Sequence, residues 1–226
     1  MDKGIGAVVF DMDGVIFDSE RLILVCWEKV GQKHGLVGIK EAALDCIGTN
    51  AVKTKEIMKE HYGEEFHYEA YSKEASVMFH EVVNRDGLPV KKGVRELMEY
   101  LKAQSIPMAL ASSTRLQVVT QELQQAGLYE YFRAVVGGDQ LKRSKPAPDI
   151  YLAACEKLGV EPADAYAIED SYNGIRASHS AGMRPIMVPD LLPATEEMYE
   201  KSIAVLDNLV MVKDFFKEIS RRKDTL

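Results

Sequence analysis

The sequence predicts an α/β fold: a parallel sheet covered by helices on both faces, with an all-helical insert after the first strand. Short apolar runs that suit strands buried on both faces recur along the chain, and amphipathic helical patterns lie between them. This alternation favours a parallel sheet. By contrast, residues 18–86 carry helical patterns but no convincing strand, so we expect a separate helical domain there.

Five strands are expected. Each is a short, nearly continuous apolar run bounded by polar residues or glycine, which is the pattern of a strand in the middle of a covered sheet. They span Ile5–Phe10, Ile106–Ala111, Ala134–Gly137, Ala165–Ile168 and Pro185–Val188.

Three helices are expected between these strands. In Gly93–Gln104 the apolar residues recur three and four positions apart, as on one face of a helix. The helix Arg115–Ala126 is followed by glycine, which favours a left-handed stop. The helix Pro148–Leu158 begins with proline, which suits the first turn, and is also followed by glycine.

The insert contains four helical stretches separated by glycines, and these define its limits. We expect a catalytic core formed by residues 1–16 and 88–226 and a helical cap domain formed by residues 17–87. The four helices are expected at Ser19–His34, Lys40–Cys46, Ala51–Tyr62 and Glu65–Arg85.

The composition limits the possible partners. The 226 residues are 46% hydrophobic and 28% charged, an ordinary globular balance, and the formal net charge is −7. A negative chain has no general attraction to nucleic acid or to an anionic membrane, so neither is an expected partner. The three cysteines are widely spaced, and the N-terminal apolar run is too short for a signal peptide. We therefore expect a cytoplasmic protein.

Two aspartates interrupt the apolar sequence VVFDMDGVIF. Asp11 and Asp13 are two residues apart in extended chain, so both side chains can address one point beyond the first strand, and Gly14 allows a sharp turn. Ligands of open α/β sheets bind at this carboxyl edge. A DxDG sequence alone more often marks the end of a strand, and the spaced oxygen ligands of a calcium loop are missing here.

Three further stretches place polar groups at strand ends or before a helix. Ser112 and Ser113 end an apolar run where a helix begins, Lys145 is followed by the restraining prolines Pro146 and Pro148, and Glu169 and Asp170 end another run. Each alone has an ordinary explanation: a helix cap, a surface lysine or an exposed loop. Together they predict a cation site formed by the carboxylates of Asp11 and Asp170 and an oxygen of Asp13. Such a site suits Mg²⁺ and a phosphoryl group.

The stretches DMDGVIFDSE, ASST, SKPAPD and IEDSYNG, in this order and spacing, resemble the four motifs of the haloacid dehalogenase superfamily. More narrowly, they resemble its phosphatase and β-phosphoglucomutase-like branch. The resemblance covers nearly the whole chain. It implies a Rossmann-like three-layer α/β/α core, a mobile helical cap over the active site and a monomer.

The resemblance also implies a role for each matching residue. Asp11 is the expected nucleophile, which forms an aspartyl-phosphate, and Asp13 the general acid and base. Ser112 is expected to hydrogen-bond the phosphoryl group, and Lys145 to neutralise it and Asp11. The phosphate-binding set is Gly14, Ser112, Ser113 and Lys145, and the Mg²⁺ set is Asp11, the backbone carbonyl of Asp13, and Asp170, with Glu169 as a further ligand or a supporting residue.

Departures from the family pattern favour hydrolysis over the other reactions. Asp13 is present, whereas the dehalogenases and phosphonate hydrolases lack this second aspartate. Ile23 and Ala51 stand where β-phosphoglucomutases carry a cap histidine and a phosphate-binding arginine. We therefore expect a Mg²⁺-dependent phosphatase for a small phosphorylated metabolite, with a sugar phosphate as the expected substrate class. The alternatives are a phosphosugar mutase and a non-catalytic protein that binds phosphorylated metabolites.

Overall fold

The computed structural model describes residues 4–47 and 51–224. The chain divides into two compact units, which are described separately. The first, the core unit, combines Met1–Phe17 with Val90–Leu226. The second, the helical unit, is Asp18–Pro89.

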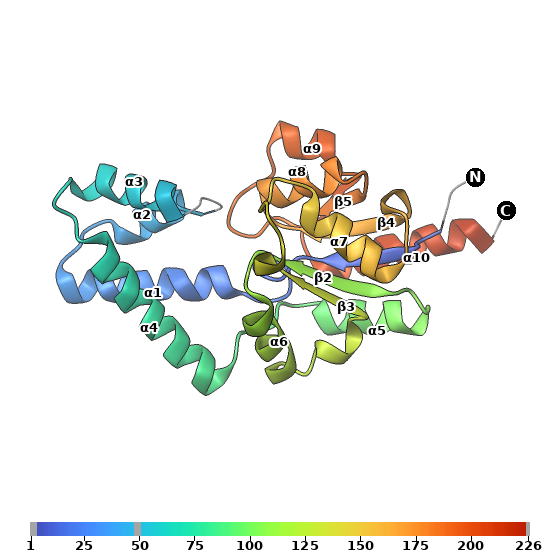
Figure 1. The fold of residues 1–226 in the computed structure, drawn as a ribbon, viewed down its shortest axis with the longest axis horizontal. Helices are drawn as coiled ribbons and strands as arrows, with labels where there is room; N and C mark the ends of the chain where they lie inside the picture. Colours follow the sequence, from blue (N-terminus) through green and yellow to red (C-terminus); the bar gives the residue numbers. More distant parts are fainter. Residues whose placement is uncertain (1–3, 48–50, 225–226) are drawn as a thin grey trace. The chain divides into compact units, whose positions relative to one another are not determined.

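The core unit is built on a six-stranded parallel sheet with strand order β3-β2-β1-β4-β5-β6 (Figure 1). The first strand is therefore central, with β2 and β4 as its neighbours. The five expected strands are present. The sixth, β6, was not predicted because it is only two half-buried residues at the sheet edge. The strands are β1 (Ala7–Phe10), β2 (Met108–Ser112), β3 (Ala134–Gly137), β4 (Ala165–Glu169), β5 (Arg184–Met187) and β6 (Ala204–Val205).

Helices cover both faces of this sheet (Figure 1). On one face, α7 (Asp149–Leu158) and α8 (Tyr172–Ser180) pack in one apolar cluster with small strand residues such as Ala109 and Ala167. On the other face the strands carry larger side chains: Tyr166 of β4 meets Phe216 of α10 (Leu209–Asp224) edge to face, at a ring separation of 5.2 Å. The predicted three-layer α/β/α, Rossmann-like fold is confirmed.

The remaining elements of the core unit are short. Helix α5 (Val94–Ala103) packs against α10, and α6 (Leu116–Gln125) against β3. Helix α9 (Glu196–Lys201) follows β5. Three single turns of 3₁₀ helix complete the unit: η1 (Tyr129–Tyr131), η2 (Gly138–Gln140) and η3 (Pro162–Asp164).

The helical unit contains the four helices expected of the insert. They are α1 (Ser19–His34), α2 (Ile39–Asp45), α3 (Ala51–Tyr62) and α4 (Tyr68–Asp86). The fourth begins three residues later than predicted. The ring of Phe66 is buried between Tyr62 and Tyr71, so the chain turns before the helix starts.

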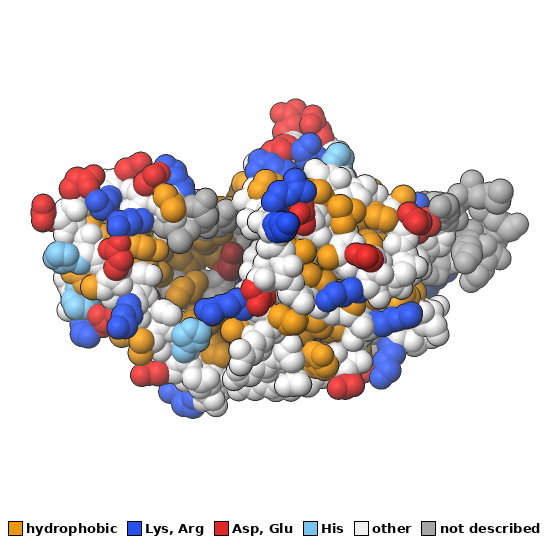
Figure 2. Space-filling view, in the orientation of Figure 1, with side chains coloured by type: hydrophobic (Ala, Val, Ile, Leu, Met, Phe, Trp, Pro, Cys, Tyr) orange, Lys and Arg blue, Asp and Glu red, His pale blue; other side chains and the backbone are white. Residues whose placement is uncertain are grey.

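Acidic and basic side chains are interspersed on the visible face of the described residues (Figure 2). Several form ion pairs within the helical unit, such as Lys33 with Glu74 and Lys40 with Glu28. Within residues 4–47 and 51–224, the helices are all too short or too polar to cross a membrane.

Candidate active site

Strand register brings the predicted site residues to one edge of the sheet. Phe10 of β1 pairs with Leu110 of β2 on one side and with Ile168 of β4 on the other. The next row along the three strands therefore contains Asp11 and Glu169. Strand order reverses between β1 and β4, and ligands of open α/β sheets bind in the crevice at such a switch point.

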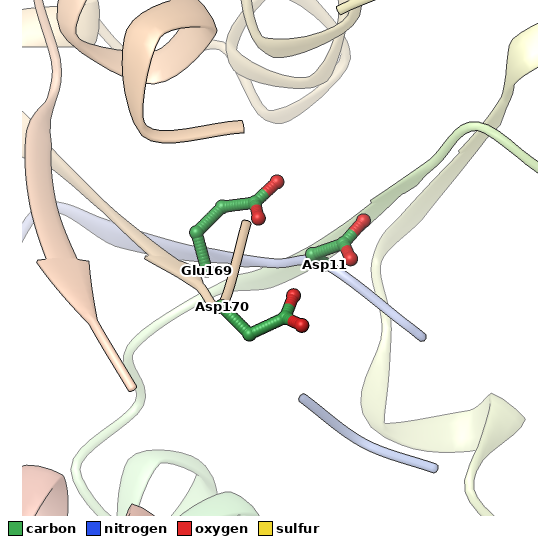
Figure 3. A group of neighbouring side chains, drawn as sticks. All are labelled: Asp11, Glu169 and Asp170. Carbon is green, nitrogen blue, oxygen red and sulfur yellow. The ribbon is translucent and has the colours of Figure 1, made fainter. Parts of the chain in front are cut away.

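Three carboxylates gather at this switch point. Asp11 follows β1, Glu169 ends β4 and Asp170 follows it (Figure 3). Each offers an oxygen within 4.8 Å of those of the other two. Asp11 and Asp170 are 7% exposed and Glu169 is fully buried. The Asp13 side chain lies outside this cluster. The expectation that the backbone carbonyl of Asp13 is a metal ligand stays a prediction.

Lys145 lies between two of these carboxylates. Its Nζ is 2.6 Å from Asp11 Oδ1 and 2.6 Å from Glu169 Oε1, and it also donates to the carbonyl oxygen of Ala111 at 3.2 Å. Burial lowers the pKa of Lys145, but the carboxylates of Asp11 and Glu169 more than offset this, so its pKa is raised overall. The lysine therefore stays a cation.

Glu169 accepts hydrogen bonds at both of its oxygens. Oε1 accepts from Lys145 and from the Tyr151 hydroxyl at 2.6 Å, and Oε2 accepts from the backbone N–H and the hydroxyl of Ser171, at 3.2 and 3.0 Å. The space for the carboxylate depends on Gly174, because a Cβ there would lie 1.8 Å from Glu169 Cδ. The Glu169 carboxylate thus accepts from four donors, and these contacts hold it where it can position Lys145.

The donor set fits a hard divalent cation. Three buried carboxylates face one ammonium group, so negative charge exceeds positive. Burial and the Glu169 carboxylate raise the pKa of Asp11 to about 8 even though Lys145 opposes them. A further cation would restore Asp11 to its ionised form, and carboxylate oxygens are the ligands that Mg²⁺ and Ca²⁺ take. Asp11 and Asp170 would hold such an ion.

Gly14 gives Asp170 the space it occupies. Its φ is +76°, a left-handed conformation that favours glycine. A Cβ at this position would also lie 2.1 Å from Asp170 Oδ2. Both facts require glycine after the two aspartates. The phosphate-binding role expected for Gly14 stays a prediction.

The end of β2 supplies hydroxyl groups. Ser112 is fully buried, and its Oγ accepts the backbone N–H of Thr114 at 3.1 Å. The Ser112 hydroxyl hydrogen can still donate to a ligand. Ser113 is exposed, and its phosphate-binding role is not tested. The Thr114 hydroxyl donates to Asp13 Oδ2 at 3.2 Å.

Residues 8–188 match the family of haloacid dehalogenase-like hydrolases. The chain belongs to this family. This haloacid dehalogenase-like hydrolase is 33% identical to the phosphorylated carbohydrates phosphatase of Thermotoga maritima over 190 residues, which is 80% of the chain and 83% of that relative. It is 30% identical to hexitol phosphatase B of Escherichia coli K12, over 81% of the chain and 83% of the relative.

A solved structure shares the fold of this hydrolase. The structure is that of a HAD family hydrolase from Deinococcus radiodurans R1 with bound phosphate and sodium. It superposes with a TM-score of 0.82 at 24% identity and covers 97% of this chain and 98% of its own. The comparisons confirm the family resemblance, its phosphatase branch and the prediction of a phosphoric monoester hydrolase.

The predicted site residues fall into two groups in the structure. Asp11, Lys145, Glu169 and Asp170 form one buried cluster, whereas Asp13 and Ser112 are connected to one another through Thr114. Ser113, which follows β2, is exposed. Sequence reasoning missed Tyr151 and Thr114. The apolar face of α7 contains Tyr151 as one more core position, and the hydrogen bond from its hydroxyl depends on a residue 18 positions away.

Proposed function

We propose that this hydrolase is a Mg²⁺-dependent phosphatase that acts on a small phosphorylated metabolite through an aspartyl-phosphate. The observation that carries the proposal is the contact of Lys145 with Asp11 at 2.6 Å inside a buried acidic cluster. A buried lysine on a carboxylate nucleophile neutralises the charge that would otherwise repel a phosphate dianion.

In the first step, Asp11 attacks the phosphorus atom of the substrate and the bond from phosphorus to the leaving oxygen breaks. Asp13 donates its proton to that oxygen, so the product leaves as a neutral alcohol. Ser112 donates to an oxygen of the moving phosphoryl group, and Lys145 offsets its charge. The products of this step are an alcohol and the Asp11 phosphate.

In the second step, Asp13, now ionised, removes a proton from water. The water oxygen attacks phosphorus, the bond to the Asp11 oxygen breaks, and inorganic phosphate leaves. One aspartate thus serves as acid and then as base. Glu169 keeps Lys145 in place throughout, because all four of its contacts are to hydrogen-bond donors.

Mg²⁺ held by Asp11 and Asp170 would orient the phosphate and stabilise its developing charge. The acidic cluster supports this choice of ion, since carboxylate oxygens suit hard cations and the charge of the cluster is incompletely balanced by Lys145. We assign the expected backbone carbonyl of Asp13 to the same set.

A sugar phosphate is the substrate class that we propose. The phosphatase of T. maritima is named for phosphorylated carbohydrates and that of E. coli for hexitols, and both match this chain over about four-fifths of its length. We propose that residues 17–87, a range close to that of the helical unit Asp18–Pro89, form a cap that selects the leaving group, and that residues 1–16 and 88–226 form the catalytic core.

The proposal is tested by measuring phosphate release from a panel of sugar phosphates with and without Mg²⁺. Wild type should turn over at least one of them only with the ion. Asp11→Asn, which keeps the shape of the side chain but not the nucleophilic carboxylate, should abolish turnover. Equal turnover by both proteins would remove Asp11 as the nucleophile, and tight binding without turnover would favour the non-catalytic alternative.

The mutase alternative is separated by a second readout. Conversion of β-glucose 1-phosphate to glucose 6-phosphate faster than phosphate release would favour it. Ile23 and Ala51 argue against that outcome. Lys55 of α3 is close in sequence to Ala51 and could replace the missing arginine, but it forms an ion pair with Glu69 within the helical unit.

A further inference from the structure

Thr114 connects two of the three strand ends that carry the proposed chemistry, those of β1 and β2. Its hydroxyl donates to Asp13 Oδ2 at 3.2 Å, and its backbone N–H donates to Ser112 Oγ at 3.1 Å. One residue thus touches the proposed acid–base group and the proposed phosphate ligand. The first and second motifs, about 100 positions apart, are connected through this side chain.

The backbone of Thr114 is held from both sides. Besides the bond from its N–H to Ser112, its carbonyl oxygen accepts the N–H of Gly138 at 2.9 Å. The approach of Gly138 is close, because a Cβ there would lie 2.2 Å from the carbonyl oxygen of Ser113. The next turn is also fixed, since Asp139 Oδ1 accepts the N–H of Leu116 at 2.8 Å. The backbone that carries the Thr114 hydroxyl is therefore held in place, and the hydroxyl itself is oriented by its bond to Asp13.

We propose that Thr114 is a positioning residue for Asp13, an inference that rests on the proposed function. A hydroxyl on Oδ2 fixes the rotation of the carboxylate and leaves Oδ1 to exchange a proton with the leaving oxygen or with water. With the exchangeable proton on Oδ1, Oδ2 remains an acceptor, so the Thr114 hydroxyl can donate to it whether Asp13 is ionised or protonated. The same contact can therefore persist through both steps.

This role predicts a dependence on the leaving group. An alkoxide of a sugar is a poor leaving group and requires the proton from Asp13. The p-nitrophenolate ion is stable without one. If Thr114 acts by aiming the acid, its loss should slow the transfer of phosphate from sugars and leave the transfer from p-nitrophenyl phosphate almost unchanged. A merely structural role would slow both reactions alike.

The experiment compares kcat/KM, which reports the first phosphoryl transfer, for the best sugar phosphate of the panel and for p-nitrophenyl phosphate. Thr114→Val keeps the shape and removes the hydroxyl. If Asp13 is no longer oriented, kcat/KM for the sugar phosphate should fall by about 10-fold or more, since general acid catalysis contributes ~10²–10⁴-fold. The kcat/KM for p-nitrophenyl phosphate should stay within about 3-fold of wild type, a change that is small beside the contribution of general acid catalysis.

Two variants complete the test. Thr114→Ser keeps the hydroxyl and should restore most of the sugar phosphate activity, whereas Thr114→Ala should reproduce the contrast without adding a methyl group to the loop. Thr120→Val, at a half-buried threonine of α6, the helix that follows the loop of Thr114, is the matched control and should leave both activities unchanged.

Equal losses on the two substrates in Thr114→Val and Thr114→Ala, or no recovery in Thr114→Ser, would overturn the positioning role. Asp11→Asn is assayed in parallel. If Asp11→Asn is inactive, equal losses in the Thr114 variants count only against the positioning role of Thr114 and not against the proposed function. If Asp11→Asn retains full turnover, the proposed function fails, and the role of Thr114 fails with it.

Discussion

The ammonium of Lys145 lies 2.6 Å from the carboxylate of Asp11, although 134 residues separate them in the chain. The strand order makes this contact possible. Asp11 leaves the central strand, and Lys145 stands before α7, the helix that covers the neighbouring strands. With Glu169 on its other side, Lys145 is the cation around which the buried acids assemble.

Lys145→Met should inactivate the enzyme and weaken the fold. The methionine has a similar length but no charge, so Asp11 and Glu169 lose their shared partner. We expect phosphate release to fall by about 10²-fold or more. The free energy of unfolding should fall by about 3 kcal/mol, the usual cost of removing one member of a buried ion pair. Urea unfolding and phosphate release measure the two effects. Lys157→Met, at an exposed lysine of α7, should change neither. Equal effects of the two variants would contradict the role of the buried cation.

Tyr151→Phe should destabilise the protein although the ring remains. The fully buried hydroxyl donates to Glu169 at 2.6 Å, and its loss should cost about 1 kcal/mol in the free energy of unfolding. Tyr172→Phe is the control, because that hydroxyl bonds to an exposed carbonyl oxygen of Pro193. Its effect should be smaller. If the two variants unfold at the same urea concentration, the hydroxyl of Tyr151 does not support Glu169.

A comparison of Gly14→Ala with Gly159→Ala separates the effect of backbone strain from that of a steric clash with Asp170. The new methyl group would meet Asp170 Oδ2 at 2.1 Å as well as straining a positive φ. Gly159→Ala is matched, since its φ is also positive but nothing lies within 4 Å of a Cβ there. The control should lose about 1–2 kcal/mol of stability and keep its activity. Gly14→Ala should lose more stability and most of its phosphate release. Retained activity in Gly14→Ala would show that the position of Asp170 is unimportant.

Glu122 should make stability depend on pH. Burial, with a smaller effect from Asp13, raises the pKa of this half-buried glutamate to about 7. A raised pKa means that the ionised form is disfavoured in the folded state, so stability is lost as the pH rises through 7. Glu122→Gln should therefore be more stable than wild type at pH 8, by on the order of 1 kcal/mol after solvent screening, and differ little at pH 5.

Urea unfolding at both pH values measures the effect of Glu122. The control is Glu130→Gln, an exposed glutamate in η1, whose effect should be small at either pH. A stabilisation by Glu122→Gln that is the same at pH 5 and pH 8 would rule out titration as its cause.

The sequence predicts the layers of this fold because buried parallel strands and amphipathic helices leave clear patterns. Helix α1 and strand β3 have the predicted limits. The edge strand β6 does not show this pattern, since two half-buried residues are too few for a periodicity. The start of α4 was misplaced because an aromatic contact of Phe66, and not helix propensity, decides where the chain turns.

The candidate site could be predicted as far as its residues occur in short motifs. Asp11, Lys145 and Asp170 belong to such motifs. Strand register places Asp11 beside the end of β4, and the segment before α7 brings Lys145 to them. The supporting contacts could not be predicted in this way. Tyr151 looks like an ordinary core residue of α7, and Thr114 like a helix-capping hydroxyl. Their roles depend on Glu169 and Asp13, partners that only the folded chain brings near.

The central claim, that Asp11 carries the phosphoryl group, is tested most directly by trapping the intermediate. The enzyme is mixed with Mg²⁺ and its best sugar phosphate, quenched in acid and treated with borohydride, which reduces an aspartyl-phosphate to homoserine. Peptide mass spectrometry should find homoserine at position 11 in wild type and unchanged asparagine in Asp11→Asn. Homoserine at another aspartate, or an unmodified position 11 during full turnover, would contradict the account.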